Sequence, residues 1–145
     1  MAKASKERGG WLFKEEPSCY SYSALEKDGG TVWGGIKNAL ARQHLRNAQV
    51  GDRVLYYHTG TERAIVGEMR IVAGPMADAD SDDPKSVVVQ VEPVKRWDPP
   101  VPLQKIKEDP YFADWELLRI SRLSVMPVSM EQWQRLEQLC RLNAK

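Results

Sequence analysis

Several aromatic side chains stand beside polar groups where the chain is expected to turn. Trp33 directly precedes a pair of glycines, and Tyr57 and His58 end an apolar run. Aromatic rings stack on the planar faces of nucleobases, and each stack contributes about 1–3 kcal/mol to binding. Asn38 offers one donor and one acceptor to the edge of a base. These residue types predict a pocket in which Trp33 and Tyr57 stack on a base while Asn38 reads its edge.

Basic residues follow this segment on a predicted helix that runs from Ile36 to about Arg46. Asn38, Arg42 and Arg46 are spaced four residues apart, so they share one polar face of that helix. The start of the helix adds free N–H groups and a partial positive charge, both of which suit an anion. We therefore expect Lys37, Arg42 and Arg46 to contact phosphates.

The overall charge is nearly balanced, with 21 Lys and Arg against 20 Asp and Glu and a formal net charge of +1. A protein that coats nucleic acid over its whole surface is usually far more basic. Binding to a polyanion is therefore expected to use a local patch. If three cations each neutralise one phosphate, the log–log salt slope of binding to B-DNA is about −2.7.

Motifs typical of enzymes are scarce in this sequence. It contains no nucleophile elbow, no P-loop and no zinc-protease motif, and its two histidines lie in different predicted elements. No metal and no cofactor is expected. An alternative is a small nucleotide- or nucleoside-processing enzyme that uses Lys14, Glu16 and His58 for acid–base chemistry. A third interpretation is a protein-interaction domain whose aromatic residues, Trp33 included, are buried core.

Length and composition indicate a globular protein. The chain has 145 residues, of which 42% are hydrophobic and 28% charged, which suits one folded domain and excludes a disordered or fibrous chain. No apolar run approaches the length of about 20 residues needed to span a membrane. Cys19 and Cys140 are far apart and form no disulfide framework or zinc motif, so we expect a cytoplasmic protein without a membrane partner.

The expected elements alternate between strands and helices, which indicates an α+β fold. Residues 1–9 are expected to be a disordered leader, and residues 10–145 a single domain. Capping-box spacing predicts helices that begin near Ser23 and Ser129. Adjacent Tyr56 and Tyr57 must point to opposite faces of their strand, so at most one of them serves a given pocket. Strands are expected near 11–17, 53–58, 64–72, 86–94, 117–120 and 123–128, with loops at 74–85 and 97–100.

Several blocks of the sequence resemble the EVE domain family of the PUA-like superfamily. Residues 11–17 are similar to the pattern W-L-x-K-x-E-P, and residues 33–42 to W-D-G-V-R-N-x-x-A-R. Residues 50–59 resemble V-G-D followed by F-Y-H-S, residues 65–67 resemble I-V-G, and residues 122–128 resemble R-L-S-V-x-P-V. The blocks appear in the family's order and run from Trp11 to the last predicted helix.

This resemblance implies a small, mixed PUA-like β-barrel flanked by helices. It also implies a non-enzymatic module that reads a modified base in an aromatic pocket, such as a modified cytosine in DNA or a methylated base in RNA. The partner would be nucleic acid that carries this base, with a possible downstream effector protein. Carried over block by block, the base-binding residues are Lys14, Trp33, Asn38, Tyr57, His58, Arg122 and Ser124.

The chain departs from the family pattern at four positions. Glu15 and Thr59 stand where many relatives have Ser, and Glu15 adds negative charge beside the expected pocket. Gly34 stands where most relatives have Asp, which removes a carboxylate that would cap the helix or touch a ligand. Lys37 stands where most have Arg, which keeps the charge but loses bidentate geometry.

Overall fold

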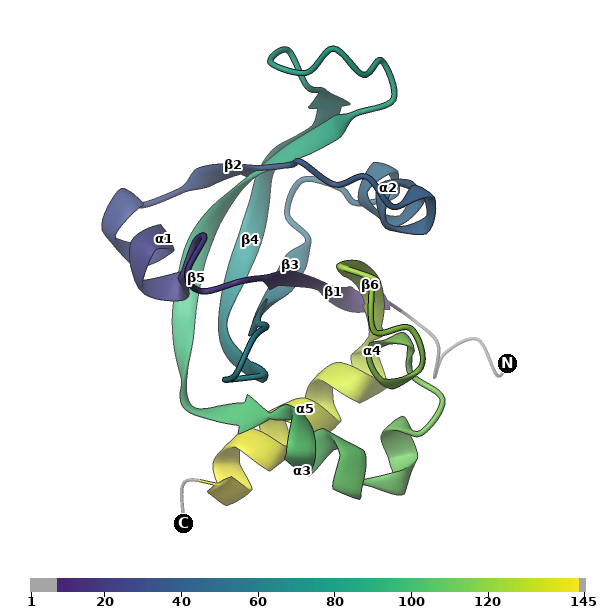
Figure 1. The fold of residues 1–145 in the computed structure, drawn as a ribbon. Coiled ribbons are helices and arrows are strands. Elements are labelled where there is room, and N and C mark those ends of the chain that lie inside the picture. The colour runs from purple at the N-terminus through teal and green to yellow at the C-terminus, as the bar shows by residue number, and fades with distance from the viewer. Residues whose placement is uncertain (1–7, 144–145) are drawn as a thin grey trace.

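The computed structural model describes residues 8–143, which form one mixed sheet with helices on both sides (Figure 1). The sheet has six strands in the order β2-β5-β4-β3-β1-β6. Its strands are β1 (Arg8–Glu15), β2 (Thr31–Trp33), β3 (Arg53–His58), β4 (Ala64–Ala77), β5 (Val87–Pro102) and β6 (Val125–Ser129). The helices are α1 (Tyr22–Asp28), α2 (Ala39–Arg46), α3 (Leu103–Glu108), α4 (Glu116–Arg119) and α5 (Met130–Asn143), with a 3₁₀ turn at Pro110–Phe112.

The predicted α+β class and the mixed sheet are confirmed. Strand β1 pairs in parallel with β3 and antiparallel with β6, and β4 pairs antiparallel with both β3 and β5. The strand order places β2 and β6 at its two ends. Closure of the sheet into a barrel is not shown by these pairings.

The two faces of the sheet are covered by different helices. Figure 1 shows α1 and α2 on the side of the sheet away from α3, α4 and α5. Helix α1 packs against β5, α2 packs against β5 and β6, and α5 packs against β1, β5 and β6. The centre of β1 is therefore covered from both sides, and Trp11, Leu12 and Phe13 are fully buried.

Side-chain caps set the ends of several helices. Ser129 and Gln132 form the predicted capping box at α5, in which each side chain accepts the other residue's backbone N–H at 3.0 and 2.9 Å. Helix α1 is capped by Ser21 rather than Ser23, and its hydroxyl accepts the N–H of Ala24. Helix α2 begins at Ala39 rather than Ile36, because the Asn38 side chain caps it.

Three predicted strand and loop boundaries and one predicted strand also differ from the structure. Strand β1 starts at Arg8, so two residues of the predicted leader belong to the sheet, while residues 1–7 lie outside the described residues. Strand β4 continues to Ala77, which shortens the predicted loop. Residues 97–100 belong to β5 rather than to a loop. They form a bulge between Arg96 and Val101, which are both paired with β4. Proline has no backbone N–H to donate to a neighbouring strand, and it is tolerated at such a bulge. Residues 117–119 are helical rather than extended. An apolar pattern this short does not distinguish the helical period of 3.6 residues from the strand period of two.

Helix α1 approaches the sheet closely at Gly67. The buried Tyr22 ring lies over Gly67, and a Cβ atom at this position would come within 2.5 Å of the ring. The Tyr22 hydroxyl also donates a hydrogen bond of 2.7 Å to the backbone carbonyl of Glu68. Glycine at position 67 therefore allows α1 to dock on the sheet.

We expect Gly67→Ala to lower the free energy of unfolding by about 1–3 kcal/mol, because overpacking forces the Tyr22 ring or the strand to shift. Chemical denaturation would show this as a lower midpoint. The control is the same substitution in a Tyr22→Ala background, where the ring is gone and the cost of adding the methyl group should disappear. An equal cost in both backgrounds would contradict this interpretation.

Candidate nucleic-acid interface

The pairing of β1 with β3 divides the predicted site residues between two faces of the sheet. The parallel register aligns Phe13 with Tyr56 and Lys14 with Tyr57. Because successive side chains alternate, each aligned pair shares a face and the two pairs point in opposite directions. The contacts agree: the Tyr56 ring lies 5.2 Å from the Trp33 ring, whereas Lys14 Nζ lies 5.7 Å from the centre of the Tyr57 ring. The prediction that Tyr56 and Tyr57 face apart is confirmed.

Trp33 belongs to a packed aromatic cluster on the face covered by α1 and α2. Its ring centre lies 5.5 Å from Phe13 and 5.2 Å from Tyr56, and Tyr56 in turn contacts Tyr22 and His58 edge-on. Trp33 is 6% exposed. The structure therefore does not contain the predicted single pocket built around both Trp33 and Tyr57, because the sheet lies between the two rings.

The His58 ring is held by two partners within the chain. Its Nε2 atom accepts the backbone N–H of Tyr22 at 3.0 Å, and its Nδ1 atom lies 2.7 Å from Glu62 Oε1. This network assigns the ring proton to Nδ1. Register places Lys14 and His58 on opposite faces, and Glu16 instead accepts the Thr59 hydroxyl at 3.2 Å. Lys14, Glu16 and His58 are not brought together as the enzymatic alternative requires.

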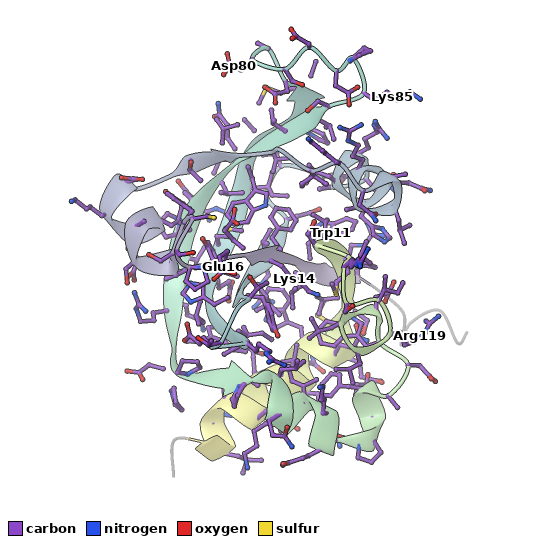
Figure 2. The ribbon with its side chains drawn as sticks, viewed as in Figure 1. Trp11, Lys14, Glu16, Asp80, Lys85 and Arg119 are labelled. Carbon is purple, nitrogen blue, oxygen red and sulfur yellow. The ribbon has the colours of Figure 1, made fainter. Side chains whose placement is uncertain are left out.

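The arginines of α2 bind the loop between β4 and β5. Arg42 donates to the carbonyl of Ile36 at 2.6 Å and to Asp83 at 2.7 Å, and Arg46 donates to the carbonyl of Lys85 at 2.8 Å. Figure 2 shows this loop, labelled at Asp80 and Lys85, beyond the end of the sheet. Hydrogen bonds from the Lys85 backbone and from Arg42 lower the pKa of Asp83. In this structure the predicted phosphate contacts Arg42 and Arg46 are therefore engaged within the protein, and Lys37 is exposed.

Gly34 leaves the segment before α2 close to β5. A Cβ atom at Gly34 would lie 2.5 Å from a methyl group of Val88, while none of the described atoms lies within 4 Å of the equivalent position at Gly35. A larger residue at position 34 would therefore require the Val88 side chain to shift.

A cavity of about 370 Å³ lies on the other face, between the sheet and helices α3 and α4. Its volume is within the range of about 300–1,000 Å³ typical of small-molecule sites. We call it the Tyr57 cavity. Its apolar lining consists of Tyr57, Leu103, Leu117 and Leu118, and its polar side chains are Lys14, Thr59, Arg63, Lys107 and Ser121.

Lys14 is held against this cavity by two hydrogen bonds. Its Nζ donates to the carbonyl of Ser121 at 3.0 Å, and its backbone N–H donates to the carbonyl of Ser124 at 2.9 Å. Figure 2 shows Lys14 near the end of β1, close to Glu16. Burial lowers the pKa of Lys14 and raises the pKa of Tyr57 to about 12. A partly desolvated ammonium group thus lies above a neutral phenol ring.

Of the predicted base-binding residues, Lys14 and Tyr57 line this cavity. Ser124 supplies only its backbone carbonyl to Lys14, and Arg122 is exposed. Sequence reasoning missed Arg63 and Lys107, along with the leucines of α3 and α4. Nothing in the local pattern marks these residues, because the turn and the helices that carry them meet Lys14 only in the folded chain.

The comparisons with known proteins identify the family. The EVE domain family model matches residues 10–139, so the chain belongs to the EVE domain family, whose fold is PUA-like. Thymocyte nuclear protein 1 of Danio rerio is 28% identical over 159 residues, covering 86% of this chain and 68% of the relative. The human protein of the same name is 27% identical over 161 residues, covering 85% and 70%.

Solved structures show the same architecture. A solution structure from Rhodopseudomonas palustris has a TM-score of 0.86 at 34% identity and covers 92% of this chain and 94% of that protein. Human thymocyte nuclear protein 1 (THYN1) was crystallised in complex with DNA that contains 5-methylcytosine. That structure has a TM-score of 0.80 at 26% identity and covers 94% of this chain and 98% of the human one. Among the described residues, no cluster of three or more potential metal ligands occurs, and no helix is long and apolar enough to cross a membrane.

Tyrosine ionisation provides a test of this packing, because burial raises the pKa of all five tyrosines. The values rise to about 12 for Tyr22, Tyr57 and Tyr111, and Tyr20 and Tyr56 are also raised from the usual 10.0. Between pH 10 and about 12 the unfolded chain therefore loses phenol protons that the folded chain keeps, so stability falls as the pH rises through this window.

Ultraviolet absorbance of the phenolate measures this directly. We expect the folded protein to ionise at clearly higher pH than the same chain in denaturant. Coincident titrations of the folded and unfolded chains would contradict the burial of Tyr22, Tyr56 and Tyr57.

Proposed function

We propose that this protein is a non-enzymatic module that binds DNA containing 5-methylcytosine. The observation that carries the proposal is the crystal structure of human THYN1 with such DNA, since that protein shares this fold over nearly its whole length. The membership of this chain in the EVE domain family supports nucleic acid as the class of ligand. The separation of Lys14 from His58 on opposite faces supports a binding role over acid–base catalysis by those residues.

We assign the reading of the base to the segment from Trp33 to Asn38, which is exposed at Gly34, Gly35, Lys37 and Asn38. The Asn38 side-chain oxygen accepts the N–H of Ala41 at 2.9 Å, so the amide group is held in a fixed orientation. Its NH₂ group is left to donate to a base acceptor. Trp33 begins this segment and is 6% exposed.

Free-energy estimates show why further contacts are needed. Turning a base out of a duplex costs a few kcal/mol, which one aromatic contact of about 1–3 kcal/mol roughly offsets. A bidentate edge contact adds about 1–3 kcal/mol. The net gain is small, so contacts to phosphates must supply much of the affinity, and binding should weaken as salt rises. Single-stranded DNA avoids most of the cost of extrusion.

We expect oligonucleotides with one 5-methylcytosine to bind about 4-fold more tightly than the matched unmethylated ones, because burying one methyl group contributes about 0.8 kcal/mol. Fluorescence titrations at fixed salt, with single- and double-stranded DNA and RNA of the same sequence, measure this ratio. Equal affinity for methylated and unmethylated DNA would contradict the proposal, and a preference for RNA would reassign the ligand.

Trp33→Phe tests the assignment of the reading segment, and Trp97→Phe is the matched control. Trp97 is also nearly buried, at 4% exposed, but lies on β5 away from this segment. We expect the methyl preference to fall in Trp33→Phe and to persist in Trp97→Phe, with circular dichroism confirming that both variants fold. Loss of the preference in both variants would show a general packing effect instead.

A further inference from the structure

We infer that the Tyr57 cavity is a binding site for a phosphoryl group, held by Lys14, Arg63 and Lys107. These three cations come from β1, from the turn between β3 and β4, and from α3, and all line one cavity. The Ser121 hydroxyl, which also lines the cavity, is a neutral hydrogen-bond donor suited to a phosphate oxygen. The described residues that line this cavity include no carboxylate.

Within residues 8–143, no ion pair involves Lys14, Arg63 or Lys107. Converging cations without counter-charges repel one another, so an anion between them relieves that repulsion as well as binding to each. Six cations elsewhere in the described residues do pair with a carboxylate: Arg42, Arg53, Arg70, Arg96, Lys105 and Arg135.

The backbone holds Arg63 in an unusual conformation at the rim. Its φ is 45°, in the left-handed region that non-glycine residues seldom adopt. The Arg63 carbonyl accepts the N–H of Leu103 at 2.8 Å, which ties the turn to the start of α3. The guanidinium Nε donates to the carbonyl of Gly60 at 3.2 Å and leaves its terminal nitrogens for a ligand. The turn and α3 therefore present Arg63 and Lys107 from one connected unit.

The surroundings of Lys14 also suit an anion. The Lys14 ammonium is positioned by the Ser121 carbonyl, a neutral partner that leaves its charge uncompensated. Burial lowers the pKa of Lys14, and a bound anion would shift it back upward. Among the described residues, the Glu16 carboxylate accepts the Thr59 hydroxyl at 3.2 Å and also lies beside Gly60 of the lining. The apolar wall of Leu103, Leu117 and Leu118 suits the sugar or base attached to a phosphate.

A phosphoryl group has two possible sources. It can be a backbone phosphodiester of the DNA, in which case the inference rests on the proposed function. It can also be the phosphomonoester of a free nucleotide. The two sources share the same oxygens and the same cations, so the experiment must separate them.

The first arm uses inorganic phosphate, deoxycytidine 5′-monophosphate and unphosphorylated deoxycytidine as probes in NMR titrations of the full chain. We expect the two phosphate compounds to shift the signals of Lys14, Arg63 and Lys107, and deoxycytidine not to do so. Arg63→Gln and Lys107→Gln should each weaken binding about 5-fold or more, as expected for loss of a charge-assisted contact. Both side chains are exposed, so the folded state should persist.

Lys27→Gln is the control, because it removes the same charge from an exposed position on α1, across the sheet from the cavity. It should leave phosphate binding unchanged. Two outcomes overturn the inference. In the first, Lys27→Gln weakens phosphate binding as much as Lys107→Gln does. In the second, neither phosphate compound binds saturably to the wild-type chain, and Arg63→Gln and Lys107→Gln leave the salt slope of DNA binding unaltered.

The second arm measures the salt dependence of binding to duplex DNA. If the site holds a backbone phosphate, each of Arg63→Gln and Lys107→Gln should reduce the log–log slope by about 0.9 in magnitude. If the slope is unchanged but the mononucleotide still binds, the site serves free nucleotides. The wild-type chain could bind methylated and unmethylated DNA equally while Arg63→Gln and Lys107→Gln still reduce the salt slope. That result would reject the proposed base reading and support the phosphoryl site.

Discussion

The parallel pairing of β1 with β3 is the constraint on which the arrangement of this domain depends. Both ends of the pair are fastened: the Trp11 indole N–H donates to Asp52 at 2.9 Å, and the N–H of Thr59 donates to the carbonyl of Glu15 at 3.0 Å. A slip of one residue between these strands would move every side chain of one strand to the opposite face. The fixed register therefore decides which groups meet.

The two faces that result have different chemical characters. On one, the rings of Phe13, Trp33 and Tyr56 pack against one another and complete a core beneath α1 and α2. On the other, Lys14 and Tyr57 border a cavity that α3 and α4 do not fill. A protein of nearly neutral net charge can still concentrate uncompensated cations at one place, while several of its other arginines are paired locally. This arrangement fits recognition of a polyanion through a limited patch.

The role of α2 follows from the same distribution of charge. Its two arginines hold the loop between β4 and β5 beside the segment from Trp33 to Asn38. They thereby shape the surface at which we place the base, while the cavity across the sheet offers the phosphate contacts. Base reading and backbone binding would then lie on opposite sides of β1, linked by the rigid pairing of β1 with β3.

The sequence by itself determined the local elements whose signals lie within a few residues, such as strand 53–58 and the capping box at Ser129. It also carried the family resemblance and the opposite orientation of Tyr56 and Tyr57. It did not separate Trp33 from Tyr57, and it did not reveal Arg63 or Lys107. Only the tertiary structure decided those points, because strand pairing and helix docking bring together residues about 50 to 90 positions apart, and no local pattern encodes such long-range pairing.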